Sequence, residues 1–153
     1  MRHFLRQPAS RPIGDEPDEQ RVRQLVEAWA CTWVWQGIYR TLEVPVGYIW
    51  DGMSIPRWAI SLAGIYTGGM GDAASLPHDA LYRAAGGAKP EGWSGCRLNT
   101  FGTPITRKEA DAVLALLMRS AGFSRYRSGL ARTAVRIGGR KHWGGPSPYG
   151  EAS

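Results

Sequence analysis

The residues with the clearest potential for chemistry lie between Asp51 and Tyr82. The segment opens with the sequence DGMSIP and closes with HDALY, in which His78 is followed directly by Asp79. An imidazole titrates near neutral pH, so it can take a proton from water during attack on an ester. A neighbouring carboxylate is the kind of oxygen ligand that calcium prefers. These residue types predict a hydrolytic site.

A further carboxylate, Asp111, lies downstream in a segment that we expect to be helical. An imidazole base works better when a carboxylate holds its other ring nitrogen and fixes its tautomer. Tyr82 lies four residues after His78, on the same face of a helix, and could donate its phenol to the same carboxylate. We therefore predict that His78, Asp111 and Tyr82 form the catalytic group, with His78 and Asp111 approaching from antiparallel helices.

A calcium ion beside the imidazole is the predicted cofactor. Asp79 points about 100° around the helix from His78, so it could hold the ion there. Asp51, on an upstream turn, or the glycine-rich loop 66–71 would complete the oxygen shell. The ion would polarise the ester carbonyl and stabilise the oxyanion. Asp79 and Asp51 are therefore the predicted metal ligands.

A β-hairpin is predicted within residues 22–46. Aromatic and apolar side chains alternate with others along 31–35, which is the period-two pattern of a half-buried strand. The break at Gln36-Gly37 predicts the turn, and Pro45 should end the ladder because it has no N–H to donate.

Helices are predicted after the strands. The first should begin at Leu76 with Ser75 as its cap and Pro77 in its first turn, and should stop at 86–87, two glycines. It would carry His78 and the residues that follow it.

The second helix should begin with a capping box from Thr106 to Glu109 and end at Gly122. Asp111 lies at the edge of its apolar stripe, directed either to the rim or to a partner. A third helix is expected over about 128–137. The predicted stripe of the second helix consists of Ala110, Val113, Leu114, Leu117, Met118 and Ala121.

The predicted fold class is α+β: a small antiparallel N-terminal sheet followed by two or three helices with long glycine-rich loops. The 153 residues suffice for one core without a metal or a disulfide. We expect an extended, proline-containing arm over 1–19, one globular domain over 20–140 and a flexible tail over 141–153.

The net charge and the composition indicate which kinds of partner the protein could bind. The net charge of +6, from 19 basic and 13 acidic residues, favours anionic lipid, nucleic acid or an acidic protein, although a solvated basic face is an equal alternative. No stretch approaches the length of an apolar membrane span, and we expect no leader. Cys31 and Cys96 fit no zinc pattern and are expected to be reduced.

Four motifs follow one another along the chain. They are D-G-x-S-I-P, H-D-x-L-Y, an Ala-Asp pair with an apolar helix, and a basic helix that ends in Gly-Gly. Over about 44–139 this order resembles a family of uncharacterised proteins associated with phages and prophages. The resemblance implies a phage or prophage origin, synthesis in the host cytoplasm, and other phage structural proteins as partners if the chain enters the virion.

The same residues also resemble a reduced core of secreted phospholipase A2, especially its bacterial form. That family carries H-D-x-x-Y on one helix and an Asp on the antiparallel partner helix. The resemblance implies His78 as general base, Asp79 as the main calcium carboxylate, Tyr82 and Asp111 as the supporting network, and Asp51 as a second calcium ligand.

The chain departs from the phospholipases in its missing disulfides. Met53, Ser75 and Ala110 stand where cysteines would be expected, and a calcium-loop consensus is absent.

Three hypotheses of function follow from the sequence. The leading hypothesis is a phage-associated, calcium-assisted lipid or ester hydrolase. The alternative is a non-catalytic virion or tail-assembly protein, whose arm and tail would order against neighbouring subunits. Nucleic-acid binding is a weaker third hypothesis, because it rests on charge alone. A His78–Asp111 hydrogen bond beside an open cleft would favour the enzyme, and a closed, packed surface would favour assembly.

Overall fold

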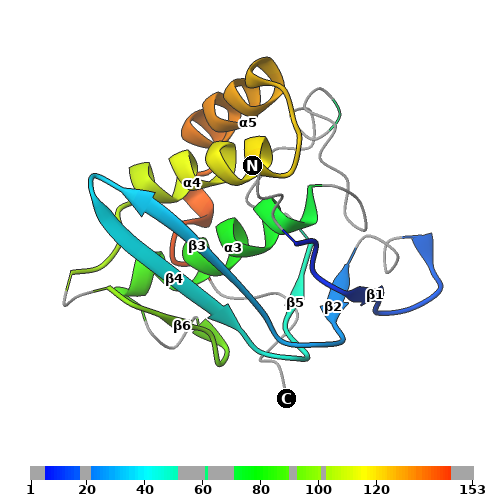
Figure 1. Cartoon of the computed structure of the whole chain (residues 1–153). Helices are drawn as coiled ribbons and strands as arrows, with labels where there is room; N and C mark the ends of the chain where they lie inside the picture. The colour runs from blue at the N-terminus through cyan, green and yellow to red at the C-terminus, as the bar shows by residue number, and fades with distance from the viewer. Residues whose placement is uncertain are drawn as a thin grey trace.

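The computed structural model describes residues 6–17, 22–51, 61, 71–89, 93–100 and 103–145 (Figure 1). Within them, two small antiparallel sheets precede or flank the helices α3, α4 and α5, with most strands on the N-terminal side. The predicted α+β fold is confirmed. No helix within the described ranges is both long and apolar enough to cross a membrane.

The first sheet has the strand order β1-β2-β5. Its strands are β1 (Ser10–Pro12), β2 (Arg23–Leu25) and β5 (Ile49–Trp50), and both pairings are antiparallel. Within the predicted arm, residues 10–12 are extended and form the edge strand β1, and bends follow at 13 and at 15–16.

The second sheet has the order β3-β4-β6 and contains the predicted hairpin. Strands β3 (Trp29–Trp35) and β4 (Ile38–Val44) pair along their whole length, and β6 (Arg97–Leu98) adds to β4. The turn at Gln36 and Gly37 has positive φ at both residues, 49° and 80°, as a two-residue hairpin requires. The hairpin and its turn are confirmed, whereas β6 was not predicted.

Helix α3 (Asp72–Arg83) begins four residues before the predicted start at Leu76. Gly71 is its N-cap, and Ser75 and Pro77 both lie inside the helix, so the predicted cap is wrong. Every residue of α3 is buried, and its apolar side chains share one core cluster with the inner faces of β3 and β4. Burial on all sides explains how the helix extends past the local signals, because packing outweighs intrinsic propensity.

Helices α4 (Arg107–Ser120) and α5 (Arg125–Gly138) begin at side-chain caps. Thr106 accepts from the Glu109 N–H at 3.1 Å, and Ser124 accepts from Arg127. The Glu109 carboxylate accepts a bond from the Trp33 indole, which ties α4 to β3. All residues of the predicted apolar stripe of α4 are buried. Helix α5 begins three residues before the predicted start.

Short 3₁₀ turns follow α3 and α5, at η1 (Ala85–Gly87) and η3 (Arg140–His142). After η3, Trp143 packs edge-to-face on the Tyr82 ring at a centroid distance of 5.0 Å, and the Gly144 N–H donates to the Tyr82 carbonyl. The described start of the predicted tail therefore packs against α3. Residues 146–153 lie outside the described ranges.

Candidate active site

His78 and Asp111 meet in the interior between α3 and α4. The ring atom Nε2 of His78 lies 3.1 Å from Oδ1 of Asp111, and the Tyr82 hydroxyl donates to the same oxygen at 2.5 Å. The Ile105 N–H donates to the Gly86 carbonyl, so the segment after α3 lies beside the segment before α4. The predicted contacts of His78 and Tyr82 with Asp111 are confirmed.

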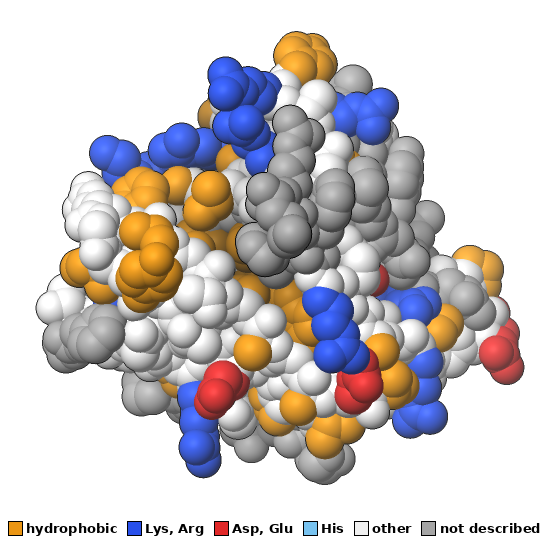
Figure 2. All heavy atoms as spheres, viewed as in Figure 1, with side chains coloured by type: hydrophobic (Ala, Val, Ile, Leu, Met, Phe, Trp, Pro, Cys, Tyr) orange, Lys and Arg blue, Asp and Glu red, His pale blue; other side chains and the backbone are white. Residues whose placement is uncertain are grey.

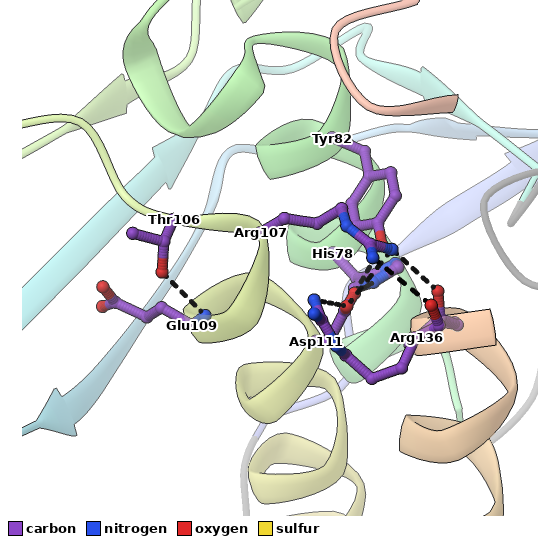
Figure 3. Close-up of polar contacts among 8 residues, drawn as sticks. His78, Tyr82, Thr106, Arg107, Glu109, Asp111 and Arg136 are labelled. Carbon is purple, nitrogen blue, oxygen red and sulfur yellow. Dashed lines mark hydrogen bonds and ion pairs between the residues drawn. The ribbon is translucent and has the colours of Figure 1, made fainter. Parts of the chain in front are cut away.

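Two arginines complete the surroundings of Asp111, and the sequence analysis missed both. Nη1 of Arg136, from α5, donates to Oδ2 at 2.9 Å, and Nη1 of Arg107 lies 3.7 Å from the same oxygen. Figure 3 shows these side chains converging on Asp111 with His78 and Tyr82. One carboxylate oxygen thus faces His78 and Tyr82, and the other faces two cations.

Asp111 is ionised because its partners outweigh its burial. Burial alone would raise its pKa, but hydrogen bonds from His78, Tyr82 and Arg136 lower the pKa below its usual range. Burial lowers the pKa of His78 and prevails over the opposing effect of Asp111. The pair is therefore a neutral imidazole beside a carboxylate. Since a carboxylate only accepts, Nε2 carries the ring proton and Nδ1 carries the lone pair.

The second ring nitrogen of His78 has no hydrogen-bond partner among the described residues. Nδ1 is buried, and the side chain is 1 % exposed, while Asp111 is 0 % exposed. A buried polar atom without a partner costs about 1–3 kcal/mol, so its presence calls for an explanation. The Tyr82 ring, with a centroid distance of 4.3 Å, covers part of the imidazole. The site is closed in this structure, unlike the open cleft that an accessible base requires.

Asp79 faces away from this cluster, toward the first sheet. The Tyr48 hydroxyl donates to its Oδ2 at 3.3 Å, and Nη2 of Arg83 lies 3.1 Å from the same atom. Arg83 also donates to the Ile49 carbonyl at 2.8 Å, and its guanidinium lies 5.1 Å from the centroid of the Tyr48 ring. An Asp–Arg pair four residues apart on one helix is a common stabilising contact, so the sequence contained a signal for it.

Burial raises the pKa of Asp79 to about 6. Arg83 lowers the pKa, and the negative charge of Asp51 raises it, so the two predicted metal ligands are close enough to interact electrostatically. The attraction of one arginine is smaller than the cost of burying this carboxylate.

Calcium binding at Asp79 stays a prediction. Calcium takes six to eight oxygen ligands, and here the guanidinium of Arg83 already lies against Oδ2 of the carboxylate. Within the described ranges no group of three or more His, Cys, Asp or Glu side chains could hold a metal. Of the loop expected to complete the shell, residues 66–70 lie outside the described ranges, and Gly71 is the N-cap of α3.

The remaining expectations concern the cysteines and the disulfide positions. Cys31 and Cys96 are buried and free of disulfide bonds, as predicted. Ser75 and Ala110 are both buried, and Met53 and most of the DGMSIP motif lie outside the described ranges.

Comparison with curated proteins and with solved structures found no match for this chain. Residues 24–135 match a protein family described as a protein of unknown function, DUF1353. The matched range includes His78, Asp79 and Asp111 but ends one residue before Arg136. Since the match covers most of the 153 residues, the chain belongs to the DUF1353 family.

Proposed function

We propose that this chain is a phage-associated hydrolase of ester bonds in which His78 is the general base. The observation that supports the proposal most strongly is the neutral imidazole of His78, held through Nε2 by Asp111, with an unpaired lone pair on Nδ1. A histidine in this state is prepared to accept a proton, because its tautomer and orientation are already fixed.

The reaction needs one water and one ester. Nδ1 of His78 takes a proton from water as the water oxygen bonds to the ester carbonyl carbon, which gives a tetrahedral oxyanion and an imidazolium. The imidazolium then returns the proton to the leaving alkoxide as the carbon–oxygen bond breaks. Asp111 stabilises the transient imidazolium, as a buried carboxylate does in other His-dependent hydrolases.

Tyr82, Arg136 and Arg107 are positioning residues in this scheme. Their bonds to Asp111 fix the carboxylate and keep it ionised. Burial and the nearby Asp111 raise the pKa of Tyr82, so its phenol stays a donor throughout the working pH range. No step is assigned to calcium, because the predicted ligand Asp79 is paired with Arg83.

Lipid esters are the proposed substrate class, and a phage or prophage is the proposed origin. The order of the motifs from Asp51 to the basic C-terminal helix supports both, and the charge of +6 favours an anionic substrate surface. Because Nδ1 is covered, catalysis requires an opening that admits water and the ester to this nitrogen.

The test is hydrolysis of phosphatidylglycerol vesicles, followed as released fatty acid. The wild-type chain should be active in the presence of a chelator, and His78→Gln should lower kcat by about 100- to 10,000-fold while the fold survives. His142→Gln is the matched control, because His142 lies in η3 and its side chain forms no hydrogen bond or ion pair with the proposed catalytic group. Equal activity of His78→Gln and wild type would refute the proposal.

A second candidate is a non-catalytic virion or tail-assembly protein. The burial of His78 and Asp111 favours it, because a network that joins α3, α4 and α5 would also serve as a purely structural core. In that case pure wild-type protein would hydrolyse no ester with or without added metals. The protein would instead be found in purified virions by mass spectrometry.

A further inference from the structure

The exposed face of α5 carries a row of arginines. Arg125, Arg132 and Arg136 are spaced seven and four residues apart, so on a helix of 3.6 residues per turn they fall within about 40° of one another. All three are exposed, and the row extends for about 16 Å along the helix axis. The Arg136 side chain remains 40 % exposed although it also contacts Asp111.

A second row of side chains lies beside the arginines on the same helix. Tyr126 and Ile137 are 77 % and 73 % exposed and lie eleven residues apart, which places them within about 20° of each other. Tyr126 and Ile137 each lie about 100° around the helix from the arginine that precedes them in the sequence. Thr133, which is also exposed, lies between Tyr126 and Ile137 along the helix axis. The outer face of α5 therefore combines three cations with an aromatic and an aliphatic side chain at its two ends.

Exposed charges along this part of the chain are basic, and the nearby carboxylate of Asp111 is buried and paired with Arg136. The sequence contains no Asp or Glu from residue 112 to residue 150. Figure 2 shows several Lys and Arg side chains over the α5 end of the molecule, with others elsewhere in the view, while the acidic side chains in that view lie mainly away from the α5 end. The basic residues of this stretch are Arg119, Arg125, Arg127, Arg132, Arg136, Arg140 and Lys141.

We propose that the outer face of α5 docks on an anionic lipid surface. A helix that lies in a membrane interface places basic side chains against the headgroups and exposed aromatic or aliphatic side chains in the acyl boundary, and α5 presents both in adjacent rows. Cations alone would serve a nucleic acid equally well, but Ile137, exposed beside them, gains from burial in lipid and not from contact with phosphates. An anionic lipid surface would also supply the ester substrate, so this proposal rests on the proposed function.

Gly129 allows a clean test of this face. It lies between the two rows, about 40° from Arg125, and a Cβ added there meets no atom within 4 Å. Gly129→Glu therefore places a negative charge at the centre of the face without a clash, and Gly129→Ala is the matched control for helix propensity. Neither variant touches the His78–Asp111 group.

Binding should be measured by co-sedimentation with vesicles of ether-linked phosphatidylglycerol, which contain no ester bond. Wild-type protein and Gly129→Ala should bind equally, and Gly129→Glu should bind about fivefold more weakly, the effect of one charge near an anionic surface. Ether-linked phosphatidylcholine vesicles should bind much less protein, and added salt should reduce binding to the anionic vesicles.

A second variant, Arg125→Glu/Arg132→Glu, reverses two charges and should abolish binding to the anionic vesicles at the same protein concentration. Circular dichroism confirms that each variant is folded. No binding by wild-type protein, equal binding to both kinds of vesicle, or equal binding by Gly129→Glu and Gly129→Ala would overturn the proposal. Tighter binding to duplex DNA than to the vesicles would also overturn it. Because these lipids cannot be hydrolysed, failure here is distinct from failure of the ester-hydrolysis test.

Discussion

Two buried carboxylates lie close to His78, and their environments shift their pKa values in opposite directions. Asp111 is 0 % exposed and has its pKa lowered, whereas Asp79 is almost as buried and has its pKa raised to about 6. Burial alone would raise both pKa values, because it penalises the charged form of any carboxyl group. The difference must therefore come from the partners.

Asp111 receives hydrogen bonds on both oxygens, from His78, Tyr82 and Arg136, at 2.5 to 3.1 Å. Asp79 has its recorded partners on Oδ2 alone, Arg83 and Tyr48, and the charge of Asp51 acts against its ionisation. Several donors directed at both oxygens of Asp111 compensate its loss of water, whereas Arg83 and Tyr48 on a single oxygen of Asp79 do not. This comparison separates the carboxylate suited to hold a histidine from the one the sequence assigned to a metal.

Asp111→Asn should have the largest effect on stability. It replaces a buried carboxylate, which accepts hydrogen bonds from His78, Tyr82 and Arg136, with an amide that has one accepting oxygen. Since a hydrogen bond to a charged group is worth about 1.5–3 kcal/mol, the free energy of unfolding should fall by about 2–4 kcal/mol. Urea unfolding followed by circular dichroism measures the change. Glu43→Gln, at an exposed position of β4, is the control and should change stability by less than about 0.5 kcal/mol. A loss below about 1 kcal/mol in Asp111→Asn would mean that its ionisation matters little.

The pH dependence of Asp79→Asn tests the other carboxylate. The folded pKa of about 6 lies above the ordinary 3.8, so the folded state holds this proton more tightly than the unfolded chain does. Stability linked to this proton is present below about pH 4 and is lost as pH rises through 6. Asn cannot ionise, so the variant does not lose this stability. Between pH 4 and pH 7 its free energy of unfolding should rise by up to about 3 kcal/mol relative to that of the wild type.

Urea unfolding of both proteins at several pH values measures this gain. For Asp111 the sign is opposite, since its lowered pKa gives stability that is present above its usual pKa and is lost in acid. A constant difference between Asp79→Asn and wild type from pH 4 to pH 7 would contradict the contrast between the two carboxylates.

Tyr82→Phe removes one donor from Asp111 and keeps the ring. A hydrogen bond to a charged group is worth about 1.5–3 kcal/mol, so the variant should lose about 2 kcal/mol of stability. Tyr126→Phe is the matched control, because Tyr126 is 77 % exposed and should tolerate the change within about 0.5 kcal/mol. Equal stability of the two variants would show that Asp111 does not depend on this donor.

Features that depend on residues close together in the sequence could be predicted from the sequence alone. The β3–β4 hairpin follows from side-chain alternation and a Gln-Gly turn, and the start of α4 follows from Thr106 as its cap. His78 and Tyr82 share a helix face because of their four-residue spacing, and Asp111 lies on the next helix, which packs against the first. Short-range periodicity therefore predicted the shared face of His78 and Tyr82, and the packing of the two helices brings Asp111 to it.

Features that depend on distant packing were not predictable. Arg136 reaches Asp111 only because α5 packs on α4, and no local pattern relates the two residues. Strand β1 is three residues long and is defined by its pairing with β2 rather than by its own pattern. The early start of α3 reflects burial of the whole helix, which outweighs the local signals of Ser75 and Pro77. The Arg83–Asp79 ion pair, by contrast, follows from a four-residue spacing that is visible in the sequence.

Addition of calcium should have the smallest effect of all. If the guanidinium of Arg83 holds Asp79, millimolar calcium should leave the melting temperature of chelator-treated wild-type protein unchanged, because a ligand stabilises a fold only in proportion to its occupancy. Arg83→Gln keeps donors near the Ile49 carbonyl but removes the cation, so Asp79 and Asp51 could then attract calcium. Calcium should raise the melting temperature of this variant and not that of Arg83→Gln/Asp79→Asn. A saturable calcium-dependent stabilisation of wild type that Asp79→Asn abolishes would restore Asp79 as a metal ligand and would assign Arg83 a different role.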